Sequence, residues 1–285
     1  MPTPSAAVLI TGCSTGIGRA TASHLARRGH TVYATARRLE SLAGLEAEGC
    51  RLLALDVTDE DSMQAAVNHV VDAEGAVGVL VNNAGYSQSG ALETVTPEDL
   101  RRQFETNVFG LTRMCQLALP GMRAQRSGKI INVSSMGANF TFPGGGVYHA
   151  TKHAVDSLSD ALRFEVAGFG IDVVIIQPGL IRTSFAETAA AAMPSSPDEG
   201  PYAEFNAALA TATKEIYEEG PAARLGGGPE TVAKAIERAI TAKRPKIRYR
   251  VTASAHLLIP PARLMPPRVW DRMMATQFVR PGRSG

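Results

Sequence analysis

The chain has 285 residues, of which 45% are hydrophobic and 20% are charged, as in ordinary globular proteins. The 29 Lys and Arg residues nearly balance the 27 Asp and Glu residues, and the net charge of +2 argues against a nucleic-acid surface. No apolar run in the sequence approaches the ~18 residues that a membrane-spanning helix needs, and the N-terminus lacks the pattern of a secretory signal. Three cysteines without CxxC spacing favour neither disulfides nor a metal site. We therefore expect a cytoplasmic protein without a bound metal.

Strand-like and helix-like segments alternate along most of the chain. Runs rich in Val, Ile and Leu predict buried strands, and amphipathic segments between them predict helices. In chain order, the expected elements are a strand at 7–11, a helix at 17–28, a strand at 31–36, a helix at 39–48, a strand at 51–55, a helix at 60–72, a strand at 77–82, a helix at 97–125, a strand at 129–134, a helix at 147–168, a strand at 171–177, helices at 202–219 and 229–242, and a strand at 247–251. This order predicts an α/β protein with a doubly wound Rossmann fold, whose parallel seven-stranded sheet carries helices on both faces.

One domain accounts for the whole chain, 1–285, with a core at about 6–251. The segment 184–228 is rich in Ala, Pro, Ser and Gly and is long for a connection, which predicts an insertion that covers the substrate. The tail 252–285 is apolar, Met-rich and interrupted by prolines, and predicts a helical extension. Packing is the simplest role for this tail. An amphipathic patch that contacts a membrane surface or a partner subunit is the alternative.

A glycine-rich segment, TGCSTGIG, follows the first strand and begins the first helix. Glycines let a backbone approach a pyrophosphate closely, and a helix N-terminus offers free N–H groups to an anion. The spacing is GxxxGxG, which differs from the common GxGxxG fingerprint, and an ordinary tight turn remains the alternative. The residues expected at the phosphates are Gly12, Ser14, Thr15, Gly16, Ile17 and Gly18.

The end of the second strand predicts the cofactor. An acidic residue there binds a ribose 2′-hydroxyl, whereas Arg accommodates a 2′-phosphate. This chain has Arg37 and Arg38 and no carboxylate at that place, which favours NADP(H) over NAD(H), although a solvated Arg pair is the alternative. Further contacts are expected where the third and fourth strands end, at Asp56, Val57, Asn83, Ala84 and Gly85. The Asn83 segment is equally suited to bracing the sheet.

The candidate catalytic residues are Ser135, Tyr148, Lys152 and Asn107. Tyr148 and Lys152 are four residues apart on a predicted helix and therefore share a face. A nearby ammonium favours a phenolate, which makes a tyrosine a usable acid and base at neutral pH. Ser135 follows the fifth strand, where it can reach Tyr148. Ser134 points to the opposite face, and His149, about 100° away from Tyr148 on the helix, is expected to be structural.

Together these motifs resemble the classical short-chain dehydrogenases/reductases in order and spacing, over roughly residues 6–185. The segments that carry the likeness are TGCSTGIG, NNAG, Asn107, the set Ser135, Tyr148 and Lys152, and Pro178-Gly179. The segment VYATARR, the NNAGY continuation and the long C-terminus are most similar to the hydroxysteroid and retinol dehydrogenase-like branch. The resemblance implies cofactor contacts at Pro178, Gly179, Ile181 and Thr183.

The resemblance also implies roles. Tyr148 would donate the proton to a carbonyl oxygen, Lys152 would lower the pKa of Tyr148 and bind the nicotinamide ribose, and Ser135 would hold the carbonyl. Asn107 would position a water next to Lys152. We therefore expect an NADP(H)-dependent enzyme that interconverts an alcohol and its ketone or aldehyde on a lipophilic substrate such as a steroid or retinoid. A homodimer or homotetramer is expected, formed through the helices at 97–125 and 150–168.

Two other functions stay open on the sequence. The first is a 3-oxoacyl thioester reductase of the same fold, which should need a basic rim near the substrate. The segment 186–220 offers only Lys214 for this purpose. The second is a cofactor-binding regulator without catalysis, against which the complete set of Ser135, Tyr148 and Lys152 argues.

Overall fold

The computed structural model describes residues 3–183, 200–216 and 221–282. Its centre is a seven-stranded sheet in the order β3-β2-β1-β4-β5-β6-β7, and all neighbouring strands are parallel. The strands are β1 (Val8–Ile10), β2 (Val32–Ala36), β3 (Arg51–Ala54), β4 (Val79–Asn82), β5 (Gly128–Val133), β6 (Ile171–Pro178) and β7 (Arg248–Val251). The predicted doubly wound fold is confirmed. The strand order reverses between β1 and β4, and in such sheets a ligand crevice forms at the carboxyl ends of the strands there.

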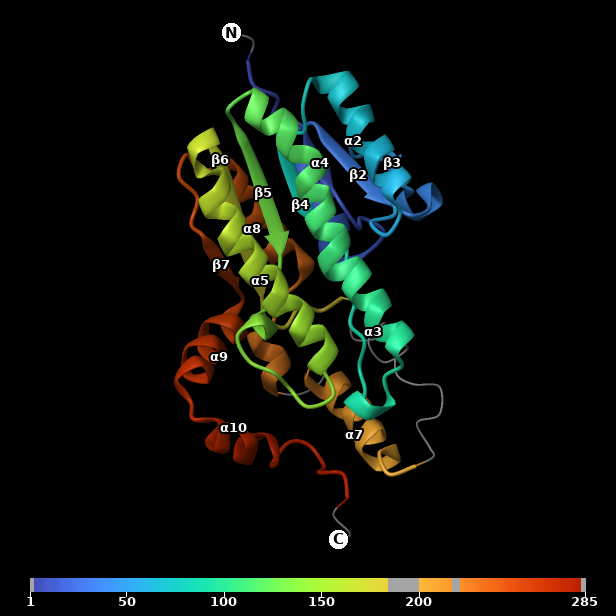
Figure 1. The fold of residues 1–285 in the computed structure, drawn as a ribbon, viewed down its shortest axis with the longest axis vertical. Coiled ribbons are helices and arrows are strands. Elements are labelled where there is room, and N and C mark those ends of the chain that lie inside the picture. Colours follow the sequence, from blue (N-terminus) through green and yellow to red (C-terminus); the bar gives the residue numbers. More distant parts are fainter. Residues whose placement is uncertain (1–2, 184–199, 217–220, 283–285) are drawn as a thin grey trace.

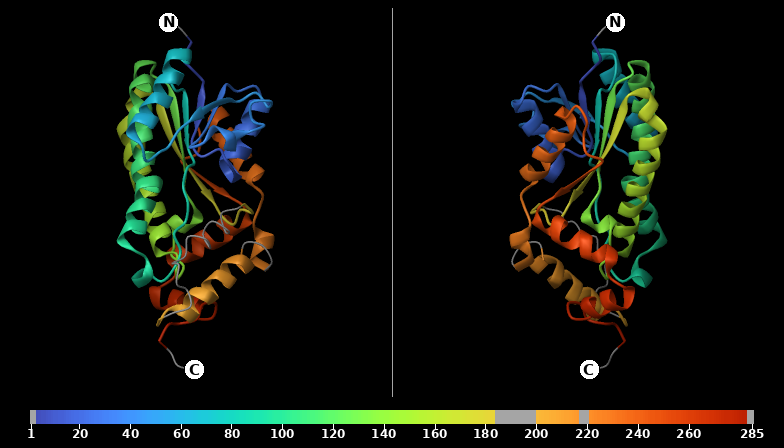
Figure 2. Two further views of the ribbon diagram at one scale, coloured as in Figure 1. Left: turned by 90° about the vertical axis from the view of Figure 1, so that its right-hand side faces the viewer. Right: turned by 90° about the vertical axis from the view of Figure 1, so that its left-hand side faces the viewer.

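Helices cover both faces of the sheet (Figures 1 and 2). The helices are α1 (Gly16–Arg27), α2 (Glu60–Glu74), α3 (Pro97–Phe104), α4 (Leu111–Ala124), α5 (Gly146–Val166), α7 (Ala203–Lys214), α8 (Pro229–Thr241), α9 (Ala253–Leu264) and α10 (Pro267–Met274). Alternate residues of each strand supply two cores. Ile10 packs with Leu25 and Ile236 on the side of α1 and α8, whereas Leu9 packs with Val67 and Met114 on the side of α2 and α4.

Two predicted helices differ from those observed. The segment 39–48 forms only a short 3-10 helix, Leu39–Leu42, followed by turns, so the prediction of a longer helix was wrong. Gly44 has a φ of +88°, a left-handed conformation that ends a helical path. The predicted helix at 97–125 contains a π-helical turn, Glu105–Gly110, between α3 and α4. This turn holds Asn107, and π-helical turns inside α-helices are common at functional sites.

Three helices of the C-terminal half, α7, α9 and α10, lie beyond the carboxyl ends of the strands (Figure 1). The tail after residue 252, for which a helical extension is predicted, contains α9 and α10. Residues 184–199 and 217–220, which belong to the predicted substrate-covering insertion, lie outside the described residues. Within the described ranges, none of the helices has the length and hydropathy that crossing a membrane requires.

Candidate active site

A cavity of about 690 Å³ runs along the carboxyl ends of the strands, and we call it the strand-end cleft. Most of the residues predicted for the site line it, although they are dispersed over more than 170 positions of the chain. These residues are Gly12, Ser14, Thr15, Gly16, Ile17, Arg37, Asp56, Val57, Asn83, Ala84, Gly85, Ser135, Tyr148, Lys152, Pro178, Gly179, Ile181 and Thr183. The fold therefore brings most of the glycine-rich turn to one cavity with Ser135, Tyr148 and Lys152.

Three predicted site residues, Gly18, Arg38 and Asn107, do not line the strand-end cleft. Gly18 is buried in α1, where an added Cβ atom would lie 2.2 Å from the carbonyl oxygen of Gly12. Its absent side chain permits close helix–turn packing, which is a different role from direct phosphate contact. Arg38 is exposed after β2 without facing the cleft.

The glycine-rich turn is shaped for close approach by a ligand. Gly12 has a φ of +73°, and a Cβ atom there would lie 2.8 Å from the Cα atom of Ala84. The side-chain amide of Asn83 braces this turn by donating to the carbonyl oxygens of Thr11 and Gly12, both at 3.0 Å. The sheet-bracing role weighed for Asn83 is therefore present. The first backbone N–H groups of α1 face the same region without helical partners, which fits a phosphate group.

The charges at the strand ends fit a phosphorylated ribose. Arg37 follows the buried Ala36 at the end of β2, is exposed and lines the cleft. Asp56 is the only carboxylate that lines the cleft in the described part of the chain, and it follows β3 instead of β2. Its Oδ1 atom accepts hydrogen bonds from the backbone N–H of Thr58 at 2.9 Å and from the Thr58 hydroxyl at 2.8 Å. Because no carboxylate follows β2 directly, an anionic group can bind at the end of this strand against the guanidinium of Arg37.

Lys152 lies buried on α5, one helical turn after Tyr148. Its ammonium donates to the carbonyl oxygen of Val133 at 2.9 Å and lies 5.7 Å from the centre of the Tyr148 ring. Burial lowers the pKa of Lys152 to about 8, and the negative charge of Asp156 opposes part of this shift. Ser135 follows β5 across the cleft, and its hydroxyl accepts a hydrogen bond from the backbone N–H of Gly137 at 3.0 Å. A phenol, an ammonium and a hydroxyl therefore border the same space.

Asn107 connects the wall of the cleft to the catalytic helix. Its Nδ2 atom donates to the carbonyl oxygen of Tyr86 at 2.9 Å and to the Thr151 hydroxyl at 3.1 Å. Its Oδ1 atom accepts from the backbone N–H of Tyr86 at 3.1 Å. The buried Asn107 side chain thus fixes the segment after β4 against the residue that precedes Lys152. This geometry supports a positioning role next to the lysine.

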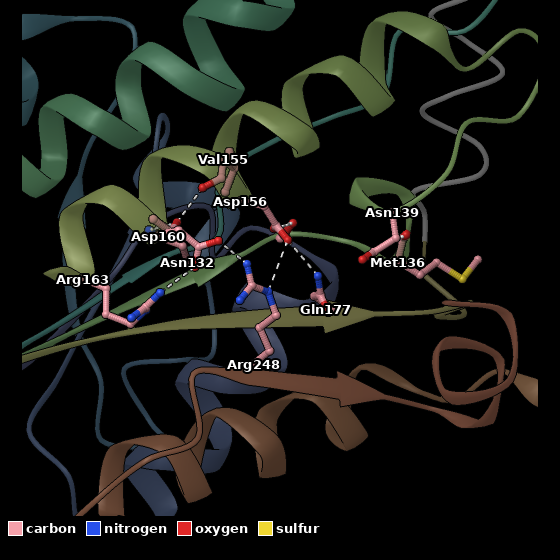
Figure 3. A network of polar contacts seen from close by, with 11 residues as sticks. Asn132, Met136, Asn139, Val155, Asp156, Asp160, Arg163, Gln177 and Arg248 are labelled. Carbon is pink, nitrogen blue, oxygen red and sulfur yellow. Dashed lines mark hydrogen bonds and ion pairs between the residues drawn. The ribbon is translucent and has the colours of Figure 1, made fainter. Parts of the chain in front are cut away.

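The sequence reasoning missed a buried carboxylate, Asp156, one turn beyond Lys152. Its oxygens accept from the Ser134 hydroxyl at 2.5 Å and from the Gln177 amide at 2.8 Å, and one lies 3.7 Å from Arg248 Nε (Figure 3). Burial raises the pKa of Asp156, and its hydrogen bonds and Arg248 lower it in part. The Ser134 hydroxyl thus donates to Asp156, although Ser134 also lines the cleft. The signal that the sequence offers for this residue is its spacing, because Asp156 stands four residues after Lys152.

Residues beyond the prediction also line the cleft, namely Ala36, Leu55, Thr58, Tyr86, Arg102, Thr106, Val133 and Ser134. Ala36 and Tyr86 lie in the segments VYATARR and NNAGY, whereas the place of the others follows only from the fold. The structural role expected for His149 is confirmed. It is buried, and its ring nitrogens contact the carbonyl oxygen of Gly137 at 2.8 Å and the backbone N–H of Phe142 at 3.4 Å. Burial lowers its pKa.

This combination of fold and site defines an oxidoreductase of the dinucleotide-binding type. The family profile described as short chain dehydrogenase matches residues 6–194, and the chain belongs to this family. It is 38% identical to a 3-ketodihydrosphingosine reductase of Bacteroides thetaiotaomicron over 86% of this chain and 87% of that protein. It is 33% identical to an NADPH-dependent 3-dehydrocapnine reductase of Ornithobacterium rhinotracheale, over 93% and 94% of the two chains. A short-chain dehydrogenase from Streptomyces avermitilis has a similar structure, with a TM-score of 0.76, 33% identity and coverage of 97% and 95%.

Proposed function

We propose that the protein reduces a ketone on a lipophilic substrate to a secondary alcohol with NADPH. The observation that carries this proposal is the single cleft that holds Ser135, Tyr148 and Lys152 together with the glycine-rich turn. Arg37 at the end of β2 favours NADPH over NADH, and an NADPH-dependent reductase among the relatives supports the same choice. The cofactor, when bound, supplies the hydride, while the protein supplies orientation and electrostatics.

The residues of the cleft have separate roles in proton transfer, in holding the substrate carbonyl and in binding the cofactor. The phenol of Tyr148 donates a proton to the substrate oxygen, and the Ser135 hydroxyl donates a hydrogen bond that holds and polarises the same carbonyl. The ammonium of Lys152 faces the Tyr148 ring at 5.7 Å and favours the phenolate left after proton transfer. Asn107 holds the segment around Tyr86 and Thr151, and thereby the position of α5. Gly12, Gly16 and the N-terminus of α1 bind the pyrophosphate.

The relatives favour a long-chain ketone over a steroid or a retinoid as the substrate. The compound in the name of the Bacteroides relative is a ketone on a long hydrocarbon chain, and that relative matches 86% of this chain. The likeness extends beyond the cofactor motifs, because the 3-dehydrocapnine reductase covers 93% of the chain, including most of its C-terminal half. We therefore place long-chain ketones first among the candidate substrates.

A substrate panel tests this function. Purified protein is mixed with NADPH or NADH and with long-chain ketones, aromatic ketones, steroids, retinal and a 3-oxoacyl thioester, and cofactor oxidation is followed by absorbance. We expect NADPH-dependent reduction that is most efficient with the long-chain ketones. Tight NADPH binding without turnover of any member would instead support the catalytically silent regulator, and a preference for the thioester would support the oxoacyl reductase.

We also propose a homo-oligomer formed through α4 and α5. Large apolar side chains are exposed on α5 and on the π-helical turn that precedes α4, with Phe109 at 54%, Leu158 at 42% and Phe164 at 86% of full exposure. Burial of such side chains against a second copy would remove apolar surface from water. Light scattering coupled to gel filtration should give a mass of two or four chains, and Phe164→Glu should lower it.

A further inference from the structure

A second cavity, of about 920 Å³, lies next to the first turn of α5, and we call it the aromatic groove. Its size falls in the range of small-molecule sites, roughly 300–1,000 Å³. One wall is the segment that follows Ser135, and the opposite wall is the C-terminal extension with α10. The rings that line it are those of Phe140, Phe142, Phe205, Trp270 and Phe278. Residues outside the Rossmann core therefore form one of the two walls of a cavity that is large enough for a small-molecule ligand.

The walls of the aromatic groove are held in place by specific contacts. The indole N–H of Trp270 donates to the carbonyl oxygen of Thr141 at 3.1 Å, and its ring stacks on Phe142 with an interplanar angle of 20°. The backbone N–H of Gly90 donates to the carbonyl oxygen of Gly144 at 2.9 Å. These contacts connect three segments that are distant in sequence. The groove is thus preformed, as most ligand pockets are.

The aromatic groove lies beside the strand-end cleft. Val147 lines the groove, and the next residue, Tyr148, lines the strand-end cleft. The buried ring of His149 lies between the two, because its centre is 5.7 Å from that of Tyr148 and 5.8 Å from that of Phe142. A substrate with its carbonyl at Tyr148 therefore has an apolar surface within reach on this side.

The lining disfavours burial of a charged group. In the described ranges, the charged side chains that line the groove are Asp271 and Arg280, and both are exposed to solvent. Apart from the polar Asn139 and Thr141, the inner surface offers rings, aliphatic side chains and glycines. A buried polar group would lose its hydration there without recovering hydrogen bonds, whereas a hydrocarbon chain loses nothing and gains apolar contact.

The geometry points to the aromatic groove as the binding site for the hydrocarbon chain of the substrate, with its carbonyl at Tyr148. This inference rests on the proposed function, because it takes the strand-end cleft as the place of reduction. It explains why the extension after Val251 belongs to the enzyme: without α10, one wall of the groove would be missing.

Two substitutions fill the groove from opposite walls. Gly146 lines it, and a Cβ atom there would have no heavy atom within 4 Å, so a side chain can begin there without a clash and Gly146→Phe adds a ring to this wall. Ala275 lines the far wall and is exposed, and Ala275→Phe narrows the groove at a distance from the catalytic helix. Gly146→Ala and Ala275→Ser are the matched controls, because they change the same positions with little added volume.

The experiment measures kcat/KM with NADPH for unbranched methyl ketones from hexanone to hexadecanone. In the wild type, each methylene should raise kcat/KM by up to about fourfold until the groove is full, the equivalent of about 0.8 kcal/mol per buried methylene. Both Phe variants should lose this gain for the long ketones and keep the wild-type value for hexanone. The two controls should retain the gain. A wild type without a chain-length gain, or Phe variants that retain it, would overturn the inference.

A binding measurement separates this inference from the proposed function. Dansylaminoundecanoic acid, a fluorescent probe with a hydrocarbon chain, should bind the wild type without any turnover, and the Phe variants should bind it at least about tenfold more weakly. If the protein reduces no ketone but binds the probe in this groove-dependent way, the proposed function fails and the groove stands. If ketones are reduced and the Phe variants bind the probe like the wild type, the groove assignment fails alone.

Discussion

The strand-end cleft and the aromatic groove share the segment 135–148, but they are built from different kinds of residue. Glycines, Arg37 and hydrogen-bonding side chains at strand ends form much of the cleft, and most of these residues stand in a recognisable spacing. Rings and aliphatic side chains from the loop after β5, α7 and the C-terminal extension form the groove. Binding a phosphate and orienting a hydride transfer require hydrogen-bonding groups at fixed positions. Binding a hydrocarbon chain requires only an apolar cavity, which many different sequences can form.

The largest effect should come from the acid in the cleft. Tyr148→Phe removes the phenolic proton without changing the ring, so turnover should fall by at least ~10²-fold, as for the loss of general acid catalysis. NADPH affinity, measured by fluorescence titration, should stay within a few-fold of the wild type. A Phe variant with wild-type turnover would show that the cleft does not work through Tyr148.

The next effect concerns the choice of cofactor. Arg37→Ala should weaken NADPH binding by about 10- to 100-fold, the value of a hydrogen bond to a charged group, and should leave NADH binding nearly unchanged. Arg38→Ala is the matched control, because Arg38 does not line the cleft. Titration of both variants with both cofactors decides the assignment. Equal losses of NADPH and NADH affinity in Arg37→Ala would contradict it.

A third prediction concerns stability. Lys152 has a pKa of about 8 when folded, against its ordinary 10.5, so the unfolded chain holds this proton more tightly. The folded state therefore gains stability as pH rises from about 8 to 10.5, by about 3 kcal/mol in all. Denaturant unfolding across this range should show the gain in the wild type and lack it in Lys152→Met. Lys234→Met, at an exposed position, should behave like the wild type. A pH-independent difference between wild type and Lys152→Met would exclude this buried titration.

The smallest effect should come from Asp156, behind the cleft. Its carboxylate favours the charged form of Lys152, so Asp156→Asn should lower the pKa of the lysine further. Loss of the Lys152 proton at alkaline pH should lower kcat/KM, and this fall should begin at a lower pH in Asp156→Asn than in the wild type. Asp160→Asn is the control, because Asp160 pairs with Arg248, whereas the charge that acts on Lys152 is that of Asp156. A pH profile identical to the wild type would make Asp156 purely structural.

Sequence reasoning was most successful where backbone geometry requires particular residues. The seven strands, the glycine-rich turn and the pair Tyr148 and Lys152 all follow from local spacing, and the structure places them as expected. It was wrong at 39–48, where helix-forming side chains suggested a helix that the left-handed Gly44 interrupts. Asp156 was missed because its partners Ser134, Gln177 and Arg248 come from three separate strand regions. The aromatic groove could not be predicted, because no spacing rule connects Phe142 with Trp270.

The central claim is that the strand-end cleft places a ketone between Tyr148 and the nicotinamide of NADPH. Deuterium transfer tests it most directly. NADPH in which both hydrogens on the reactive carbon of the nicotinamide ring are deuterium is incubated with the protein and a long-chain ketone, and the alcohol is analysed by mass spectrometry and NMR. The account predicts one deuterium, on the carbinol carbon, in the wild type and almost none in Tyr148→Phe over the same time. Alcohol without label at that carbon, or no alcohol from protein that binds both compounds, would contradict it.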